Sequence, residues 1–170
     1  MVSESARATT ATEACYRVDH PNSRPRSIKV IALDAVSAGL VKRVAQAPWT
    51  RASFFTSSID GATRQDDQVW SMQNWLADLA GRTKDMVDEI DTADLVVMVA
   101  AAGGRPHSAS MIGEACSLKN VMTTALIVDA QATSPQALSD TLACLRPHAS
   151  MLVVADGEEY IEAMLSALRA

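Results

Sequence analysis

The sequence predicts an α/β fold, a doubly wound, Rossmann-like three-layer sandwich with a mainly parallel sheet of about five strands. Two observations predict it. First, short apolar runs that are mostly free of charge are typical of strands buried on both faces of a sheet; they are Ile28–Leu33, Ala52–Thr56, Leu95–Ala101, Val121–Val128 and Met151–Val154. Second, the segments between these runs have apolar residues at helical spacing, so strands and helices alternate along the chain.

Each predicted helix is identified by one apolar face. The faces are Leu40, Val41 and Val44; Val69, Met72, Leu76 and Leu79, with Trp75 beside them; Met86, Val87 and Ile90; Met111, Ile112, Ala115 and Cys116; Leu138, Leu142 and Leu145; and Ile161, Met164, Leu165 and Leu168. Two helix starts are also predicted. Ser134 precedes a proline at the first helical position, and Asp156 to Glu159 resembles a capping box.

The length of 170 residues favours one domain. Residues 1–26 are rich in Ser, Thr, Ala and Arg and lack a period, so we expect a flexible leader followed by a single domain over 27–170. Trp70 and Trp75 are five residues apart on one predicted helix and cannot both face the core. This exposure, with the apolar surface of a lone Rossmann half, predicts a homodimer.

The composition excludes several classes of partner and location. The net charge is −5 and no basic stripe is present, which argues against a nucleic-acid partner. No apolar run is long enough to cross a membrane, and the N-terminus lacks the apolar centre of a signal peptide. The three cysteines have no metal-binding spacing, and Cys116 and Cys144 are predicted to be buried free thiols. These features fit a cytoplasmic protein.

The carboxyl ends of the strands are where such sheets bind ligands. Four of the five predicted ends carry an aspartate, at Asp34, Asp60, Asp129 and Asp156. One interpretation is that these side chains cap helices. The other is that some hold Mg²⁺, which would bridge to a phosphate. Arg105 and His107 are the cationic candidates for an anionic ligand.

Several segments, in order, resemble the FtsZ/tubulin-like GTPase domain. Ile28–Ile31, a turn of small residues and Ala38–Val44 resemble its first strand, glycine turn and helix; Asp94–Ala100, Gly103-Gly104 with Ser108–Ala115, Met122–Val128 and Leu142–Val154 resemble its later strands and phosphate loop. The likeness covers residues 28 to about 160. It implies a Rossmann-like nucleotide-binding half.

The departures from that family concern the phosphate contacts. Asp34, Ala35 and Val36 stand where the family has glycines, and Arg105-Pro106-His107 interrupts its glycine and threonine signature. The chain also reaches Ala170 before the family's acidic catalytic loop, so we expect no GTP hydrolysis by this chain alone.

The predicted function is therefore a degenerate FtsZ/tubulin-like domain that acts as a non-hydrolysing ligand-binding or assembly module. The alternative is a small Rossmann-fold enzyme acting on a nucleotide or phosphorylated metabolite. The candidate cofactors are a nucleotide and Mg²⁺. The candidate ligand-binding residues are Asp34, Ser37, Gly39, Gly103, Gly104, Arg105, His107, Ser108 and Ser110.

No catalytic residue is assigned from the sequence. Ser108 or Ser110 with His107 and Asp129 would be a nucleophile set, but no G-x-S-x-G turn frames either serine, and helix capping by Ser108 is favoured. The three histidines are scattered, so no metal site is predicted.

Overall fold

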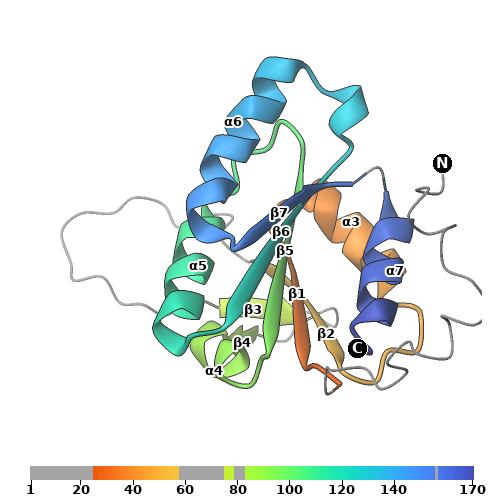
Figure 1. Cartoon of the computed structure of the whole chain (residues 1–170), viewed down its shortest axis with the longest axis vertical. Helices are drawn as coiled ribbons and strands as arrows, with labels where there is room; N and C mark the ends of the chain where they lie inside the picture. The colour runs from red at the N-terminus through yellow and green to blue at the C-terminus, as the bar shows by residue number, and fades with distance from the viewer. Residues whose placement is uncertain (1–24, 58–74, 79–82, 156) are drawn as a thin grey trace, which may run out of the picture.

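The fold is an α/β sandwich, as the sequence predicts (Figure 1). The computed structural model describes residues 25–57, 75–78, 83–155 and 157–170. The strands are β1 (Ile28–Ala32), β2 (Ala52–Ser57), β3 (Trp75–Asp78), β4 (Thr83–Asp85), β5 (Leu95–Ala101), β6 (Met122–Val128) and β7 (Met151–Val154). The helices are α3 (Ala35–Val44), α4 (Met86–Asp91), α5 (Ser108–Lys119), α6 (Pro135–Leu145) and α7 (Glu158–Ala167), with short 3-10 turns at Ala130–Ala132 and Arg146–His148.

The sheet has the strand order β4-β3-β2-β1-β5-β6-β7. The strands β2, β1, β5, β6 and β7 are parallel to one another. Numbered among themselves they have the order 2-1-3-4-5, one of the common doubly wound arrangements. The predicted parallel sheet is therefore confirmed, and an antiparallel pair, β3 and β4, extends it beyond β2.

Helices cover both faces of the sheet. Side chains of α4, α5 and α6 pack on one face, against residues such as Ile31 and Met98. Side chains of α3 and α7 pack on the other, against residues such as Val30 and Val97. All seven residues of β5 are buried, because β5 is the middle one of the five parallel strands, with helices on both faces. This double burial explains why the central strands β1, β5 and β6 consist mostly of apolar residues.

Four details of the sequence prediction are wrong. The helical face that includes Leu76 is not helical at Trp75–Asp78, which forms β3 and pairs antiparallel with β2. The free edge of β2 offers backbone partners there, and such tertiary pairing overrides the local helical spacing. The argument for a dimer from two tryptophans on one helix therefore fails. Trp70 and the rest of residues 58–74 lie outside the described residues.

The second correction concerns the start of α7, where Gly157 rather than Asp156 is the N-cap and no side chain caps the helix. Asp156 itself lies outside the described residues, as does most of the predicted leader. By contrast, Ser134 does cap α6, because its hydroxyl accepts a hydrogen bond from the Ala137 N–H at 3.3 Å.

The third and fourth corrections are the exposure of Cys144 and the start of β6. Cys116 is buried as predicted, but Cys144 is exposed, because the inward face of α6 carries Thr141 and Leu145 instead.

The strand predicted from Val121 begins one residue later. Asn120 is left-handed (φ 56°) and ends α5, and the Val121 N–H bonds to the Cys116 carbonyl as part of that turn.

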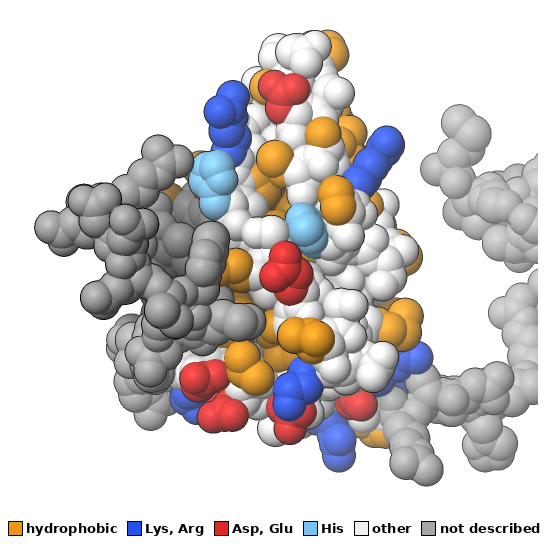
Figure 2. All heavy atoms as spheres, turned by 90° about the vertical axis from the view of Figure 1, so that its left-hand side faces the viewer, with side chains coloured by type: hydrophobic (Ala, Val, Ile, Leu, Met, Phe, Trp, Pro, Cys, Tyr) orange, Lys and Arg blue, Asp and Glu red, His pale blue; other side chains and the backbone are white. Residues whose placement is uncertain are grey.

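Charged side chains of both signs gather at the lower end of the face that carries α5 (Figure 2). Among the ion pairs of the described residues, Asp91 of α4 meets Lys119 of α5 at 2.6 Å. Glu89 accepts hydrogen bonds from Lys29 at 2.8 Å and from Lys84 at 3.2 Å. Lys29 is a buried residue of β1, so Glu89 supplies the countercharge that its burial requires.

Candidate functional site

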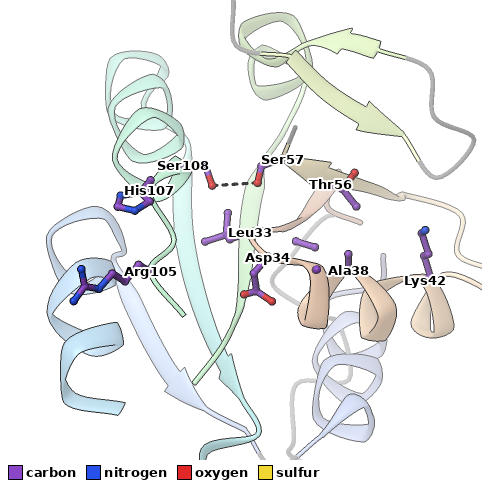
Figure 3. Close-up of a pocket in the computed structure, with 11 residues that line it drawn as sticks. Leu33, Asp34, Ala38, Lys42, Thr56, Ser57, Arg105, His107 and Ser108 are labelled. Atoms are coloured by element: carbon purple, nitrogen blue, oxygen red, sulfur yellow. Dashed lines mark hydrogen bonds between the residues drawn. The ribbon is translucent and has the colours of Figure 1, made fainter. Parts of the chain in front are cut away.

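A cleft of about 430 Å³ opens at the carboxyl ends of β1 and β2 (Figure 3). It lies at the switch point of the sheet. The chain leaves β1 toward one face, into α3, and leaves the neighbouring β5 toward the other face, into α5, so the two connections diverge and leave a crevice. The residues that line it are Ala32, Leu33, Asp34, Ala35, Ala38, Lys42, Thr56, Ser57, Arg105, His107 and Ser108.

Asp34 occupies the N-terminus of α3 with its own carboxylate. Its Oδ1 accepts a hydrogen bond from the Ser37 N–H at 2.8 Å, and its Oδ2 accepts one from the Ala101 N–H at 2.8 Å. In return the Asp34 N–H donates to Ser37 Oγ at 3.2 Å, which completes a capping box. The first βα turn of such folds is where phosphate groups commonly bind. Here a carboxylate already holds that position and accepts hydrogen bonds from two backbone N–H groups.

The capping interpretation of the aspartates is thus correct for Asp34. Asp129 differs, because it is left-handed (φ 57°) before a 3-10 turn and makes no side-chain cap. It is not among the residues that line the cleft, so the set of a serine, His107 and Asp129 is not brought together there. Asp60 and Asp156 lie outside the described residues.

The two glycines after β5 form a turn that is held to α6 by hydrogen bonds. Gly103 has φ +85°, a conformation that favours glycine. Its N–H donates to Thr141 Oγ1 at 3.0 Å, and the Thr141 hydroxyl lies 2.9 Å from the Gly104 carbonyl, to which it donates. The Gly104 N–H bonds to the Ala101 carbonyl at 3.1 Å. Both glycine N–H groups are therefore engaged within the protein.

Gly104 is also needed for close packing. A Cβ at this position would lie 3.1 Å from the Ala101 carbonyl oxygen and 3.7 Å from Asp34 Oδ2. Gly104 is therefore closely packed against Asp34 and the end of β5, with little room for a side chain. Gly39, by contrast, is exposed on α3, and a Cβ there would meet nothing within 4 Å. Neither Gly39 nor the buried Ser37 lines the cleft.

The start of α5 contributes two hydroxyls and two exposed basic side chains. The buried Ser108 hydroxyl donates to Ser57 Oγ at 3.1 Å, across the upper side of the cleft (Figure 3). The Ser110 hydroxyl donates to the His107 carbonyl at 3.2 Å and does not line the cleft. Figure 3 shows the guanidinium of Arg105 and the ring of His107 pointing outward, away from the Asp34 carboxylate.

Three polar lining residues were not assigned as ligand-binding from the sequence: Lys42, Thr56 and Ser57. Lys42 could have been found from helical spacing, because it follows Asp34 and Ala38 at intervals of four along α3. Thr56 and Ser57 end β2, and only the adjacency of β2 and β1 brings them to the same edge. Within the described lining, Lys42 and Arg105 are the lysine and arginine residues, and Asp34 is the one acidic residue.

The arrangement suits binding better than acid–base chemistry. A general base must reach the proton that it removes. In the part of the lining that the structure describes, the Ser57–Ser108 pair is joined by a hydrogen bond, and the His107 ring lies apart from it and points outward. No group of three or more His, Cys, Asp or Glu side chains that could hold a metal ion occurs among the described residues.

Comparison with known proteins adds no assignment. No protein-family model and no curated protein sequence matches this chain. Among the residues that the structure describes, no helix has both the length and the apolar character that crossing a membrane requires.

Proposed function

We propose that this chain is a non-hydrolysing binding module, a degenerate relative of the FtsZ/tubulin-like domain, whose cleft takes a small anionic metabolite. The observation that carries the proposal is the position of Asp34. Its carboxylate accepts the N–H groups of Ser37 and Ala101, where a nucleotide's phosphates would otherwise lie. A phosphate placed there would meet a negative charge and donors that are already used.

The remaining lining indicates the chemistry of the ligand. Lys42 and Arg105 offer charge to a carboxylate or phosphate at the rim, and Ser57 and Ser108 offer hydroxyls to a polar body. Leu33 and the small residues Ala35 and Ala38 form the apolar part of the lining. The ligand therefore carries its anionic group toward the rim rather than at the N-terminus of α3.

Mg²⁺ does not fit this arrangement at Asp34. Both carboxylate oxygens face backbone N–H donors, and a divalent cation would be repelled by the same hydrogens that the oxygens accept. The ligand is therefore expected to bind without a metal bridge to Asp34.

The test is a thermal-shift screen of the full chain. GTP, GDP, sugar phosphates and small di- and tricarboxylates are each tested with and without Mg²⁺. A ligand at about 100 times its Kd adds roughly 2.7 kcal/mol of stability, which raises the melting temperature by several degrees. We expect the response from a small carboxylate or monophosphate, independent of Mg²⁺, and its loss in Lys42→Ala.

Two outcomes would contradict the proposal. One is a Mg²⁺-dependent response to GTP with release of phosphate, which would support the nucleotide enzyme that is the alternative function. The other is a response that Lys42→Ala and Arg105→Ala leave unchanged. Arg169→Ala is the matched control, because this exposed arginine near the end of α7 does not line the cleft. The predicted homodimer is independent of the cleft and stays a prediction.

A further inference from the structure

The strand β7 is the outer strand at one end of the sheet, and it is unprotected. Figure 1 shows it between α6 and α7. It pairs with β6 on one side, and no strand of the described residues pairs with the other. Edge strands are usually protected by lysine, proline or a bulge. The sequence of β7, Met-Leu-Val-Val, contains no such residue, and Met151 and Val154 are 50% and 44% exposed.

The outward backbone groups of β7 follow from its pairing with β6. The Ala155 N–H donates to the Ile127 carbonyl at 2.8 Å, toward β6 and in register with the Ile127–Val154 pair. In a parallel ladder the residues that bond to a given neighbour alternate, so Val153 and Met151 also face β6. Leu152 and Val154 consequently direct their N–H and C=O groups toward the free edge.

We infer that β7 pairs antiparallel with β7 of a second copy of this chain, about a twofold axis at Val153. The axis must pass through a residue, because residues opposite each other in a sheet share a face and side chains alternate between faces. An axis at Val153 places Leu152 opposite Val154 of the second copy. These are the residues with outward backbone groups, so two hydrogen-bonded pairs form on either side of the axis.

Charge around the strand favours the antiparallel direction. The exposed Arg146 precedes β7, and the exposed Glu159 follows it at the start of α7. Antiparallel pairing brings the basic start of one strand beside the acidic end of the other. A parallel pairing would instead bring like charges together. The two copies are therefore electrostatically complementary only in the antiparallel arrangement.

Exposed apolar side chains beside the edge would be covered by the pairing. Met122, at the start of β6, is 56% exposed and lies on the same sheet face as Met151, because Met151 is in register with Thr124, two residues after Met122. Pairing of β7 with its copy places the two Val153 side chains against each other, on the same face as Met151. Burial of this apolar surface adds to the backbone hydrogen bonds.

The first experiment measures mass and uses a matched pair of charge variants. Light scattering of the full chain at high micromolar concentration is expected to give twice its 18.1 kDa mass. Met151→Lys should give the monomer mass, because it places a charge at the edge. Leu118→Lys, an exposed position on α5 away from β7, should leave the dimer intact. A monomeric wild type, or a dimer that survives Met151→Lys, would overturn the inference.

The second experiment tests the register by disulfide formation. In a chain with Cys15→Ser and Cys144→Ser, Val153→Cys should cross-link to its copy on oxidation, because opposite residues have Cβ atoms about 4.5–5.5 Å apart, near the disulfide range. Met151→Cys, two residues from the axis, should not. Cross-linking of Met151→Cys alone, or of neither variant, would refute the register. Ligand binding in the cleft is measured separately on Met151→Lys, so failure of the dimer and failure of the proposed function are distinguishable.

Discussion

Asp34 Oδ2 accepts a hydrogen bond from the backbone N–H of Ala101 at 2.8 Å, which joins the N-terminus of α3 to the last residue of β5. The two residues are 67 positions apart in the sequence. The other carboxylate oxygen caps α3 through the Ser37 N–H. One side chain thus fixes the geometry of the switch point and fills it with negative charge.

The first prediction is that Asp34→Ala destabilises the protein. It removes the N-cap of α3, which costs about 0.5–2 kcal/mol. It also leaves the Ala101 N–H without its acceptor, which costs about 1–3 kcal/mol for a buried donor. Urea denaturation measures the total. Asp129→Asn is the control, because Asp129 is exposed, makes no cap and has a left-handed backbone that asparagine tolerates. Equal stability of the two variants would contradict this role for Asp34.

The second prediction concerns Asp34→Gly and phosphate. The change removes a negative charge and a Cβ from the N-terminus of α3, so affinity for phosphate and for GDP should rise, as measured by isothermal titration calorimetry. If Asp34 instead holds Mg²⁺, the same variant should lose any Mg²⁺-dependent binding that the wild type has. Phosphate affinity that is unchanged at matched ionic strength would show that the charge of Asp34 does not exclude the anion.

The third prediction is a pH dependence from Glu89. Partial burial raises the pKa of this carboxyl, but hydrogen bonds and attraction from Lys29 and Lys84 outweigh that effect and lower the pKa below its ordinary value of 4.5. Because the folded pKa is the lower one, the unfolded state binds the proton more readily. The stabilisation is therefore fully present above the ordinary pKa and is lost as the pH falls through the folded pKa.

Glu89→Gln tests this assignment. It should lower the free energy of unfolding at pH 7 by about 2 kcal/mol or more, because the buried Lys29 loses its countercharge. The variant should also lose part of the acid dependence below the ordinary carboxyl pKa. Asp140→Asn is a suitable control, because Asp140 is exposed and contacts Gln136 rather than a lysine. An acid transition of the same steepness in Glu89→Gln and wild type would contradict the prediction.

The fourth prediction is that the thiols of Cys116 and Cys144 differ in reactivity. Burial raises the pKa of Cys116 to about 12, so almost none of it is thiolate at neutral pH, whereas Cys144 is exposed. In a Cys15→Ser background, a maleimide should label one thiol rapidly and the second only in denaturant. Mass spectrometry of the digested product should place the rapid label on Cys144. Rapid native labelling of Cys116 would mean that α5 opens readily from the sheet.

The candidate site shows where prediction from sequence stops. Asp34 could be predicted as a helix cap, since a cap depends on residues three positions apart along the chain. Its bond to Ala101 could not, because nothing local indicates that β5 lies next to β1. The hydrogen bonds of Thr141 to the glycine turn are likewise long-range, so the sequence predicts Gly103 and Gly104 as ligand-binding residues although their N–H groups are engaged within the protein.

The sequence by itself determined the alternation of strands and helices, because burial on both faces of a sheet requires mostly apolar runs and amphipathic helices require their own spacing. It did not determine the strand order. The antiparallel strand at Trp75–Asp78 exists because the edge of β2 supplies backbone partners, against the helical spacing of its apolar residues. The cleft exists because β1 and β5 are neighbours whose chains leave toward opposite faces. Both features depend on contacts between distant segments, and only the tertiary structure brings those segments together.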